Sequence, residues 1–288
     1  MTTRVCVLGY PVGHSLSPAM HNAAFAELGL NWAYDAIEVA PADFDTLLRE
    51  LPDRGYVGAN VTVPHKLAAL AAADSVTDTA RAVGAANTLS FTDGRIAADN
   101  TDVDGFLRAL RGQVPGAPAG MRALVLGAGG AGRAVIYGLL REGAATVEVW
   151  NRNPERATGL VEEFQGLGEG VPLVAVTEPR LDGVDLLVNA TSVGMALGRR
   201  NDAHSDDFKL LRISADTLGE VQVVADLVYR DGGTALLREA SARDLIRVDG
   251  VDILVHQGAA SFELWTGLEA PLEVMRDGAR KRQNAGDP

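Results

Sequence analysis

Short apolar runs alternate along the chain with longer stretches that are rich in Ala and Leu. The apolar runs occupy residues 5–8, 58–63, 123–126, 146–150, 185–189 and 221–228. Each has the length and composition of a buried strand, and the stretches between them are long enough for helices. This βα rhythm is typical of parallel sheets covered by helices. The pattern therefore predicts an α/β fold.

Three segments interrupt the rhythm. Residues 112–120, GQVPGAPAG, are rich in Pro and Gly, and a new strand begins directly after them, so they predict a loop at the edge of a second domain. The polar residues 196–207 predict a second loop. The charged segment from Arg276 onward predicts a loosely held chain end.

Length and charge narrow the class of protein. The 288 residues suffice for two domains, and a net charge of −12 disfavours nucleic acid and anionic membranes as partners. The single cysteine, Cys6, cannot form an internal disulfide, and no apolar run is long enough to span a bilayer. We therefore expect a cytoplasmic protein. The five histidines lack metal-ligand spacing, so no metal is expected.

The most informative segment is a glycine turn between a predicted strand and a predicted helix. Its residues are Gly127, Ala128, Gly129, Gly130, Ala131, Gly132 and Arg133. Glycines at this spacing permit a tight turn and let a pyrophosphate approach the backbone at the helix N-terminus. A glycine turn without a ligand is the alternative, but the strand before and the helix after favour a dinucleotide site.

The end of the next strand indicates which dinucleotide would bind. An NAD site places a carboxylate there, whereas this chain has Asn151, Arg152 and, slightly later, Arg156. Glu148 lies nearby, but the strand period of two directs it to the opposite face from Asn151. Two arginines suit a 2′-phosphate. A single arginine there would be better explained as a solvated charge, but two without an acid predict NADP(H).

Five polar clusters follow apolar stretches outside this unit. They are GHSLSP at 13–18, NVTVPHK at 60–66, GAANTL at 84–89, DNTD at 99–102 and HQG at 256–258. Their hydroxyls, amides, one Lys and one Asp suit a small polyhydroxylated ligand. Structural roles are the alternative: Ser17, Thr101 or Asp102 could cap a helix, and Asn87 could be a turn residue.

Taken together and in this order, the motifs resemble those of the shikimate dehydrogenase family. Further matches are GAGGAGR, NRNPER, NATSVGM at 189–195, DLVY at 226–229 and HQGAASFELWTG at 256–267. The resemblance implies a substrate-binding domain at residues 1–103 and 250–288 and a Rossmann-type NADP-binding domain with a parallel sheet at 104–249. It implies NADPH-dependent, reversible reduction of 3-dehydroshikimate to shikimate by a monomer or homodimer.

The resemblance also implies roles for particular residues. Lys66 and Asp102 would be the catalytic pair. The substrate contacts would be Ser15, Ser17, Asn60, Thr62, Asn87, Tyr229 and Gln257. Besides the glycine turn and residues 151, 152 and 156, the cofactor contacts would include Thr191, Ser192, Met195 and Gly250.

Ketone reduction by a nicotinamide requires a proton on the developing alkoxide, and Lys66 is the natural donor, with Asp102 orienting its ammonium group. Three details depart from the family pattern: residues 230–234 lack prolines, Ala98 replaces a common glycine, and Gly258 replaces a common alanine. A quinate/shikimate dehydrogenase, an aminoshikimate dehydrogenase or a non-catalytic nucleotide sensor are the alternatives. The sensor is disfavoured because Lys66 and Asp102 are both present.

Overall fold

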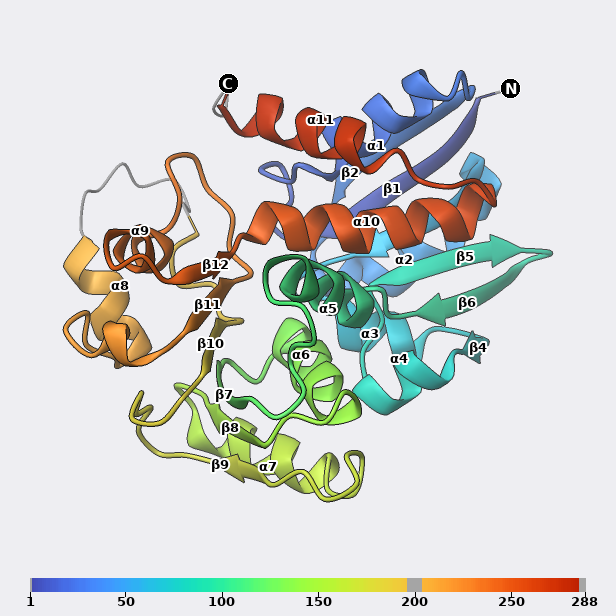
Figure 1. Cartoon of the computed structure of the whole chain (residues 1–288). Coiled ribbons are helices and arrows are strands. Elements are labelled where there is room, and N and C mark those ends of the chain that lie inside the picture. Colours follow the sequence, from blue (N-terminus) through green and yellow to red (C-terminus); the bar gives the residue numbers. More distant parts are fainter. Residues whose placement is uncertain (1, 196–203, 285–288) are drawn as a thin grey trace. The chain divides into compact units, whose positions relative to one another are not determined.

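The computed structural model describes residues 2–195 and 204–284 (Figure 1). The chain divides into two compact units, which we call unit 1 (Met1–Gly105 with Leu254–Pro288) and unit 2 (Phe106–Ile253). Each unit contains its own six-stranded sheet. No helix in the described parts of the chain has the length and apolar character needed to cross a membrane. The predicted α/β fold class is confirmed.

Unit 1 is built on a mixed sheet. Its strands are β1 (Thr3–Gly9), β2 (Trp32–Glu38), β3 (Tyr56–Val61), β4 (Ser75–Val76), β5 (Thr88–Thr92) and β6 (Arg95–Asp99). Its helices are α1 (Ser17–Glu27), α2 (Phe44–Glu50), α3 (Lys66–Ala71), α4 (Asp78–Val83) and α11 (Leu272–Asn284). α5 (Asp102–Gln113) starts in unit 1 and ends in unit 2, whereas α10 (Gly250–Thr266) starts in unit 2 and ends in unit 1.

The sheet of unit 1 has the order β2-β1-β3-β5-β6-β4. β1 pairs in parallel with β2 and β3, but β5 is antiparallel to both β3 and β6. The βα rhythm did not predict the β5–β6 hairpin. Its turn contains Asp93 and Gly94, both with positive φ, which is the Asp-Gly signal for a tight hairpin.

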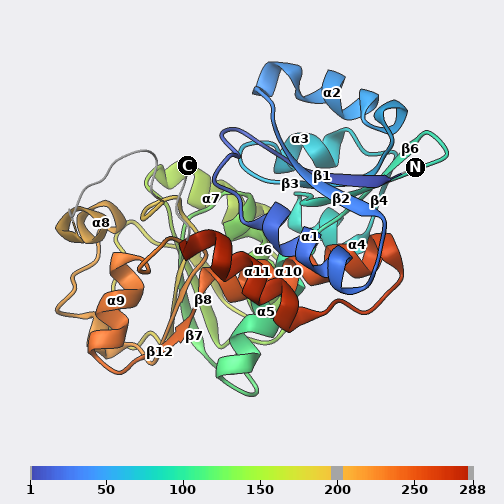
Figure 2. The ribbon, with the colours of Figure 1, turned by 90° about the horizontal axis from the view of Figure 1, so that it is seen from above.

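Helices cover both faces of this sheet (Figure 2). α2 and α3 pack on one face, where Phe44, Leu48 and Ala69 join an apolar cluster with strand residues. α1, α10 and α11 lie on the other face, and α1 packs directly along α11. α10 comes close to its neighbours through glycines: a Cβ on Gly105 would lie 2.6 Å from the Cβ of Gln257. This close packing fixes Gln257 beside the start of α5.

Unit 2 has a fully parallel sheet in the order β12-β11-β10-β7-β8-β9. The strands are β7 (Arg122–Leu126), β8 (Thr146–Trp150), β9 (Leu173–Ala175), β10 (Leu186–Asn189), β11 (Val223–Asp226) and β12 (Ile246–Val248). The helices are α6 (Gly130–Arg141), α7 (Pro154–Glu163), α8 (His204–Leu211) and α9 (Ala235–Ala242). Counted within the unit this order is 6-5-4-1-2-3, the doubly wound Rossmann arrangement. The order of the strands reverses between β7 and β10, the position at which such sheets bind ligands.

Several local predictions are corrected. Of the predicted loop at 196–207, residues 196–203 lie outside the described residues, and residues 204–207 belong to α8. The chain is not loose from Arg276, because α11 continues to Asn284 and buries Met275 and Ala279. The strand predicted at 221–228 is shorter, since β11 spans Val223–Asp226.

Candidate functional site

One edge of the unit 1 sheet gathers most of the polar motifs. Asn60, Thr88 and Asp99 are paired across β3, β5 and β6. Because β5 is antiparallel to its neighbours, the ends of β3 and β6 and the start of β5 lie at the same edge. The segments next to these residues therefore come together. They carry Lys66 after β3, Asn87 before β5 and Asp102 after β6.

Lys66 and Asp102 form an ion pair at this edge. The Lys66 Nζ lies 2.5 Å from Asp102 Oδ2, and their side chains are 11% and 17% exposed. The other carboxylate oxygen, Oδ1, accepts a hydrogen bond of 2.8 Å from the Asn87 amide. Asn87 is buried, and its side chain positions the Asp102 carboxylate instead of facing solvent in a turn. The carboxylate is thus fixed from both sides, with the ammonium group held at one oxygen.

Behind this pair lies a buried polar network that sequence reasoning assigned only in part. Asn60 Nδ2 is within 3.0 Å of Thr88 Oγ1 and 2.8 Å of Ser261 Oγ, and Asn60 Oδ1 accepts from Tyr34 Oη at 2.8 Å. The Asn60 amide is therefore occupied by protein partners, so its predicted ligand contact stays a prediction. Ser261 was missed, although it lies four residues after Gln257 on the same face of α10.

Gln257 belongs to the same network, with its Oε1 3.2 Å from Asn87 Nδ2. Ser17 is the first residue of α1 and not its N-cap, which is Leu16, so the capping alternative for Ser17 is wrong. The Thr101 hydroxyl contacts Asn87 and Ser261. Ser15 Oγ accepts from the Ser17 backbone N–H.

The hydroxyl groups of Ser17 and Thr62 have no hydrogen-bond partner among residues 2–195 and 204–284, which leaves both able to bind a ligand. Both follow strands that end at the edge carrying Lys66, since β1 and β3 are parallel. Six of the seven predicted substrate contacts thus belong to unit 1. The seventh, Tyr229, belongs to unit 2.

In unit 2 the glycine turn joins β7 to α6 at the point where the strand order reverses. Gly127 has a φ of +113°, and a Cβ on Gly132 would lie 2.1 Å from the Gly127 carbonyl oxygen. These two glycines are required by the turn itself. Gly129 is different, because a Cβ there would meet nothing within 4 Å. Its lack of a side chain leaves room in front of the N-terminus of α6, where a pyrophosphate would bind.

The end of β8 provides the other part of the predicted cofactor site. Asn151 Oδ1 accepts a hydrogen bond of 3.1 Å from Ala128 N–H, so this residue links β8 to the glycine turn. Arg152 and Arg156 are exposed at the start of α7, and neither forms an ion pair within the described part of the chain. Their positive charges are available to an anionic group.

Arg133 was also predicted to contact the cofactor. Its guanidinium group instead pairs with Glu163 on α7 and lies 5.0 Å from the centre of the Phe164 ring. The side chain is mostly buried there and joins α6 to the end of α7. A cofactor contact from this side chain stays a prediction, and the observed contacts are structural.

The remaining predicted cofactor residues lie after β10 or at the start of α10. Thr191 donates to Asn189 Oδ1 at 2.7 Å, and Met195 N–H donates to the Ser192 carbonyl. Gly250 starts α10 and is tightly packed, since a Cβ there would lie 2.7 Å from the Val228 carbonyl oxygen. The residues after β10 lie near the point where the strand order reverses, because β10 is adjacent to β7.

Three family models match the chain. Their descriptions are shikimate dehydrogenase substrate binding domain for residues 7–89, shikimate / quinate 5-dehydrogenase for 113–207 and shikimate 5'-dehydrogenase C-terminal domain for 250–278. A shikimate dehydrogenase (NADP(+)) of Methanopyrus kandleri is 46% identical over 96% of this chain and 94% of its own length. The chain belongs to the shikimate dehydrogenase family. The resemblance inferred from the motifs is confirmed.

Solved structures of the family are similar to this chain over nearly its whole length. A shikimate 5-dehydrogenase from Thermus thermophilus, in complex with NADP(H) and shikimate, has a TM-score of 0.83 and 42% identity, covering 98% of this chain and 100% of its own. A shikimate dehydrogenase in complex with NADP+ has a TM-score of 0.86 and 34% identity, covering 98% and 96%.

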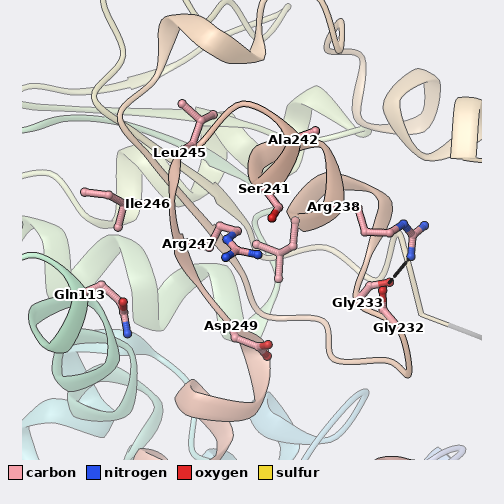
Figure 3. A pocket seen from close by; sticks show the side chains of 11 residues that line it. Gln113, Gly232, Gly233, Arg238, Ser241, Ala242, Leu245, Ile246, Arg247 and Asp249 are labelled. Atoms are coloured by element: carbon pink, nitrogen blue, oxygen red, sulfur yellow. Dashed lines mark hydrogen bonds between the residues drawn. The ribbon is translucent and has the colours of Figure 1, made fainter.

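Unit 2 also has a groove that the family motifs do not explain (Figure 3). Its volume is about 840 Å³, and it is lined mainly by α9, β12 and the residues next to them, among them Arg238, Ser241, Ile246, Arg247 and Asp249. β12 is at the edge of the sheet, three strands away from β7. None of the predicted site residues lines this groove, so it is separate from the predicted cofactor site.

Proposed function

We propose that the protein is an NADPH-dependent shikimate dehydrogenase that reduces 3-dehydroshikimate to shikimate reversibly. The observation that carries this proposal is the pair formed by Lys66 and Asp102, 2.5 Å apart and anchored by Asn87. Family membership supplies the substrate class, since a relative from Thermus thermophilus was solved with shikimate and NADP(H). The hydroxyls and amides around the pair suit a ligand with several hydroxyl groups.

Lys66 supplies the proton in this mechanism. Its ammonium group stabilises negative charge on the carbonyl oxygen and donates the proton that turns the alkoxide into a hydroxyl. Asp102 keeps the ammonium group in place through Oδ2, while Asn87 prevents the carboxylate from rotating. In the reverse direction Lys66 takes the proton back.

The residues of unit 2 fit NADP(H). The turn leaves space at Gly129, no carboxylate stands at the end of β8, and Arg152 and Arg156 are exposed without ion pairs in the described ranges. When bound, the reduced nicotinamide supplies the hydride for the carbonyl carbon. The two arginines would hold the 2′-phosphate and so reject NADH.

The decisive test of the proposed function follows NADPH and NADH absorbance in parallel with 3-dehydroshikimate, and NADP+ and NAD+ with shikimate and quinate. We expect turnover with NADPH and 3-dehydroshikimate and with NADP+ and shikimate. Activity with NADH alone would contradict the cofactor assignment. A clear preference for quinate would place the protein among the quinate/shikimate dehydrogenases.

The role of the arginines gives a second prediction. Replacing both residues (Arg152→Ser and Arg156→Ser) should raise the KM for NADPH by about tenfold or more, since a charge-assisted hydrogen bond contributes about 1.5–3 kcal/mol before solvent screening. The KM for 3-dehydroshikimate should not change. Arg180→Ser, at another exposed arginine of unit 2, is the matched control. An unchanged KM for NADPH in the double variant would place the 2′-phosphate elsewhere.

A further inference from the structure

A buried carboxylate in unit 2 connects the segment after β10, which carries predicted cofactor contacts, to the segment after β11, which carries the predicted substrate contact Tyr229. Asp226 is the last residue of β11 and is completely buried. Its Oδ1 accepts hydrogen bonds from Asn189 Nδ2 at 2.9 Å and from Val228 N–H at 3.0 Å. Its Oδ2 accepts from the Thr234 hydroxyl at 2.7 Å. Three donors from three segments thus converge on one side chain.

Through Asn189 this carboxylate determines the conformation of residues 191–193, directly after β10. Asn189 is paired with Asp226 at the ends of the adjacent strands β10 and β11. With its Nδ2 held by Asp226, Asn189 presents Oδ1 to both the N–H and the hydroxyl of Thr191, at 3.1 and 2.7 Å. The same Nδ2 also lies 3.1 Å from the Val193 carbonyl oxygen. The segment with the predicted contacts Thr191 and Ser192 is therefore oriented by this pair.

The other two segments are held in the same way. Val228, whose N–H is bound by Asp226, immediately precedes Tyr229. Thr234 is the N-cap of α9 and also accepts from Leu237 N–H, which leaves the hydrogen of its hydroxyl to bind Asp226. The start of α10 packs against the backbone of Asp226, because a Cβ on Gly250 would lie 2.9 Å from the Asp226 carbonyl oxygen.

We propose that Asp226 is a positioning residue for the cofactor, whose ionised carboxylate holds residues 191–193 after β10 and the segment after β11 in the conformation that binds NADP(H). This inference rests on the proposed function. Asp226 itself need not touch either ligand. The ionised form is the one that matches the geometry, since all three groups around the carboxylate donate hydrogen bonds to it. A protonated carboxyl would offer a hydrogen where the Thr234 hydroxyl already offers one.

A change in the protonation state of Asp226 should therefore change the affinity for NADP(H). Burial raises the pKa of the Asp226 carboxyl to about 7, the charge of Asp249 adds to the increase, and the three hydrogen bonds oppose it. The elements packed around Asp226 carry further charged or titratable groups: Tyr229, Arg230 and Asp231 in its own loop, Arg238 on α9, and Asp249 after β12. Arg238 donates to the carbonyl oxygens of Gly232 and Gly233, and β10 contributes the neutral Asn189.

The inference predicts opposite effects of pH on cofactor affinity and on stability. Affinity should rise with pH, because only the ionised form holds the loops. Stability should fall over the same range. A carboxyl with a raised pKa in the folded state stabilises the fold at low pH, and this contribution is lost as pH rises through its folded pKa. A residue with a merely structural role would change stability without this opposite change in affinity.

The test compares the Kd of NADP+ at pH 6 and pH 8, by isothermal titration calorimetry without substrate, in the wild type, Asp226→Asn and the exposed control Asp216→Asn. If only the ionised form binds, the wild type should bind about tenfold more tightly at pH 8, the ratio of the ionised fractions for a group titrating near 7. The 2′-phosphate also titrates near pH 6, but it does so equally in all three proteins.

We expect Asp226→Asn to bind weakly at both pH values and to lose the pH dependence that Asp216→Asn retains. The same pH dependence in Asp226→Asn and the wild type would overturn the inference. Absence of NADP+ binding to the wild type at either pH would instead contradict the proposed function.

If circular dichroism shows that Asp226→Asn does not fold, the Kd of NADP+ is measured for Thr234→Val and Thr234→Ser instead. The valine removes the donor to Oδ2, and the serine keeps it. Weaker binding by the valine variant with near wild-type binding by the serine variant supports the inference, and equal binding by both overturns it.

Discussion

Replacing Lys66 with alanine is expected to lower kcat by a factor of about 10² to 10⁴, the usual contribution of a positioned general acid. The KM for 3-dehydroshikimate should change little, because the hydroxyls and amides that surround the pair remain. The physical reason is that the ammonium group acts on charge that develops only in the transition state. Steady-state kinetics with NADPH in excess measure both parameters.

A matched control separates this effect from loss of a surface charge. Lys281→Ala removes an exposed lysine of α11 in the same unit and should leave both parameters unchanged. Lys66→Ala removes the ion pair with Asp102 and leaves its hydrogen bond with Asn87 in place. Thermal unfolding of both variants therefore has to show that the fold is intact. A folded Lys66→Ala enzyme with near wild-type turnover would show that another group is the acid.

The fold class could be predicted because apolar runs of strand length alternate with helices. The same pattern failed for the antiparallel hairpin of β5 and β6, since periodicity says nothing about strand direction. The local signal was the turn at Asp93 and Gly94, which joins two short runs and favours a hairpin. It also failed at the chain end, where a charged sequence forms α11 because Met275 and Ala279 are buried.

The candidate site could be predicted as a set of motifs, but not as a network. Lys66, Asn87 and Asp102 stand in polar motifs beside apolar runs, and the resemblance to the family assigned their roles. Thr88 lies in the GAANTL motif but was given no role, and Ser261 was not identified, because a small hydroxyl residue within a helix has no distinctive pattern. Their importance depends on partners far away in the chain, such as Asn60, 201 residues before Ser261.

The role of Asp226 was hidden for a related reason. In sequence it is a single acid at the end of an apolar run, and the family motif that contains it implies a ligand contact only for Tyr229. Only the pairing of β10 with β11 brings it to Asn189, and only the cap of α9 brings it to Thr234. Such side chains support binding residues without sharing their chemistry.

The glycine turn allows a prediction that separates folding from cofactor binding. Gly132→Ala should reduce both, because its Cβ would lie 2.1 Å from the Gly127 carbonyl oxygen and 2.9 Å from its carbonyl carbon. These are backbone atoms, so α6 must move away from the end of β7. Overpacking of this kind costs about 1–3 kcal/mol, and we expect a lower free energy of unfolding together with a KM for NADPH raised at least about tenfold.

Gly129→Ala should behave differently. A Cβ there meets nothing within 4 Å and the backbone is extended, with φ −90° and ψ −173°, so the free energy of unfolding should stay close to that of the wild type. Its methyl group would nevertheless occupy the space in front of α6, and the KM for NADPH should rise. Gly159→Ala, in α7 with equally open surroundings, is the control that should leave the KM unchanged. Equal KM values for Gly129→Ala and Gly159→Ala would mean that the pyrophosphate does not approach the turn at Gly129.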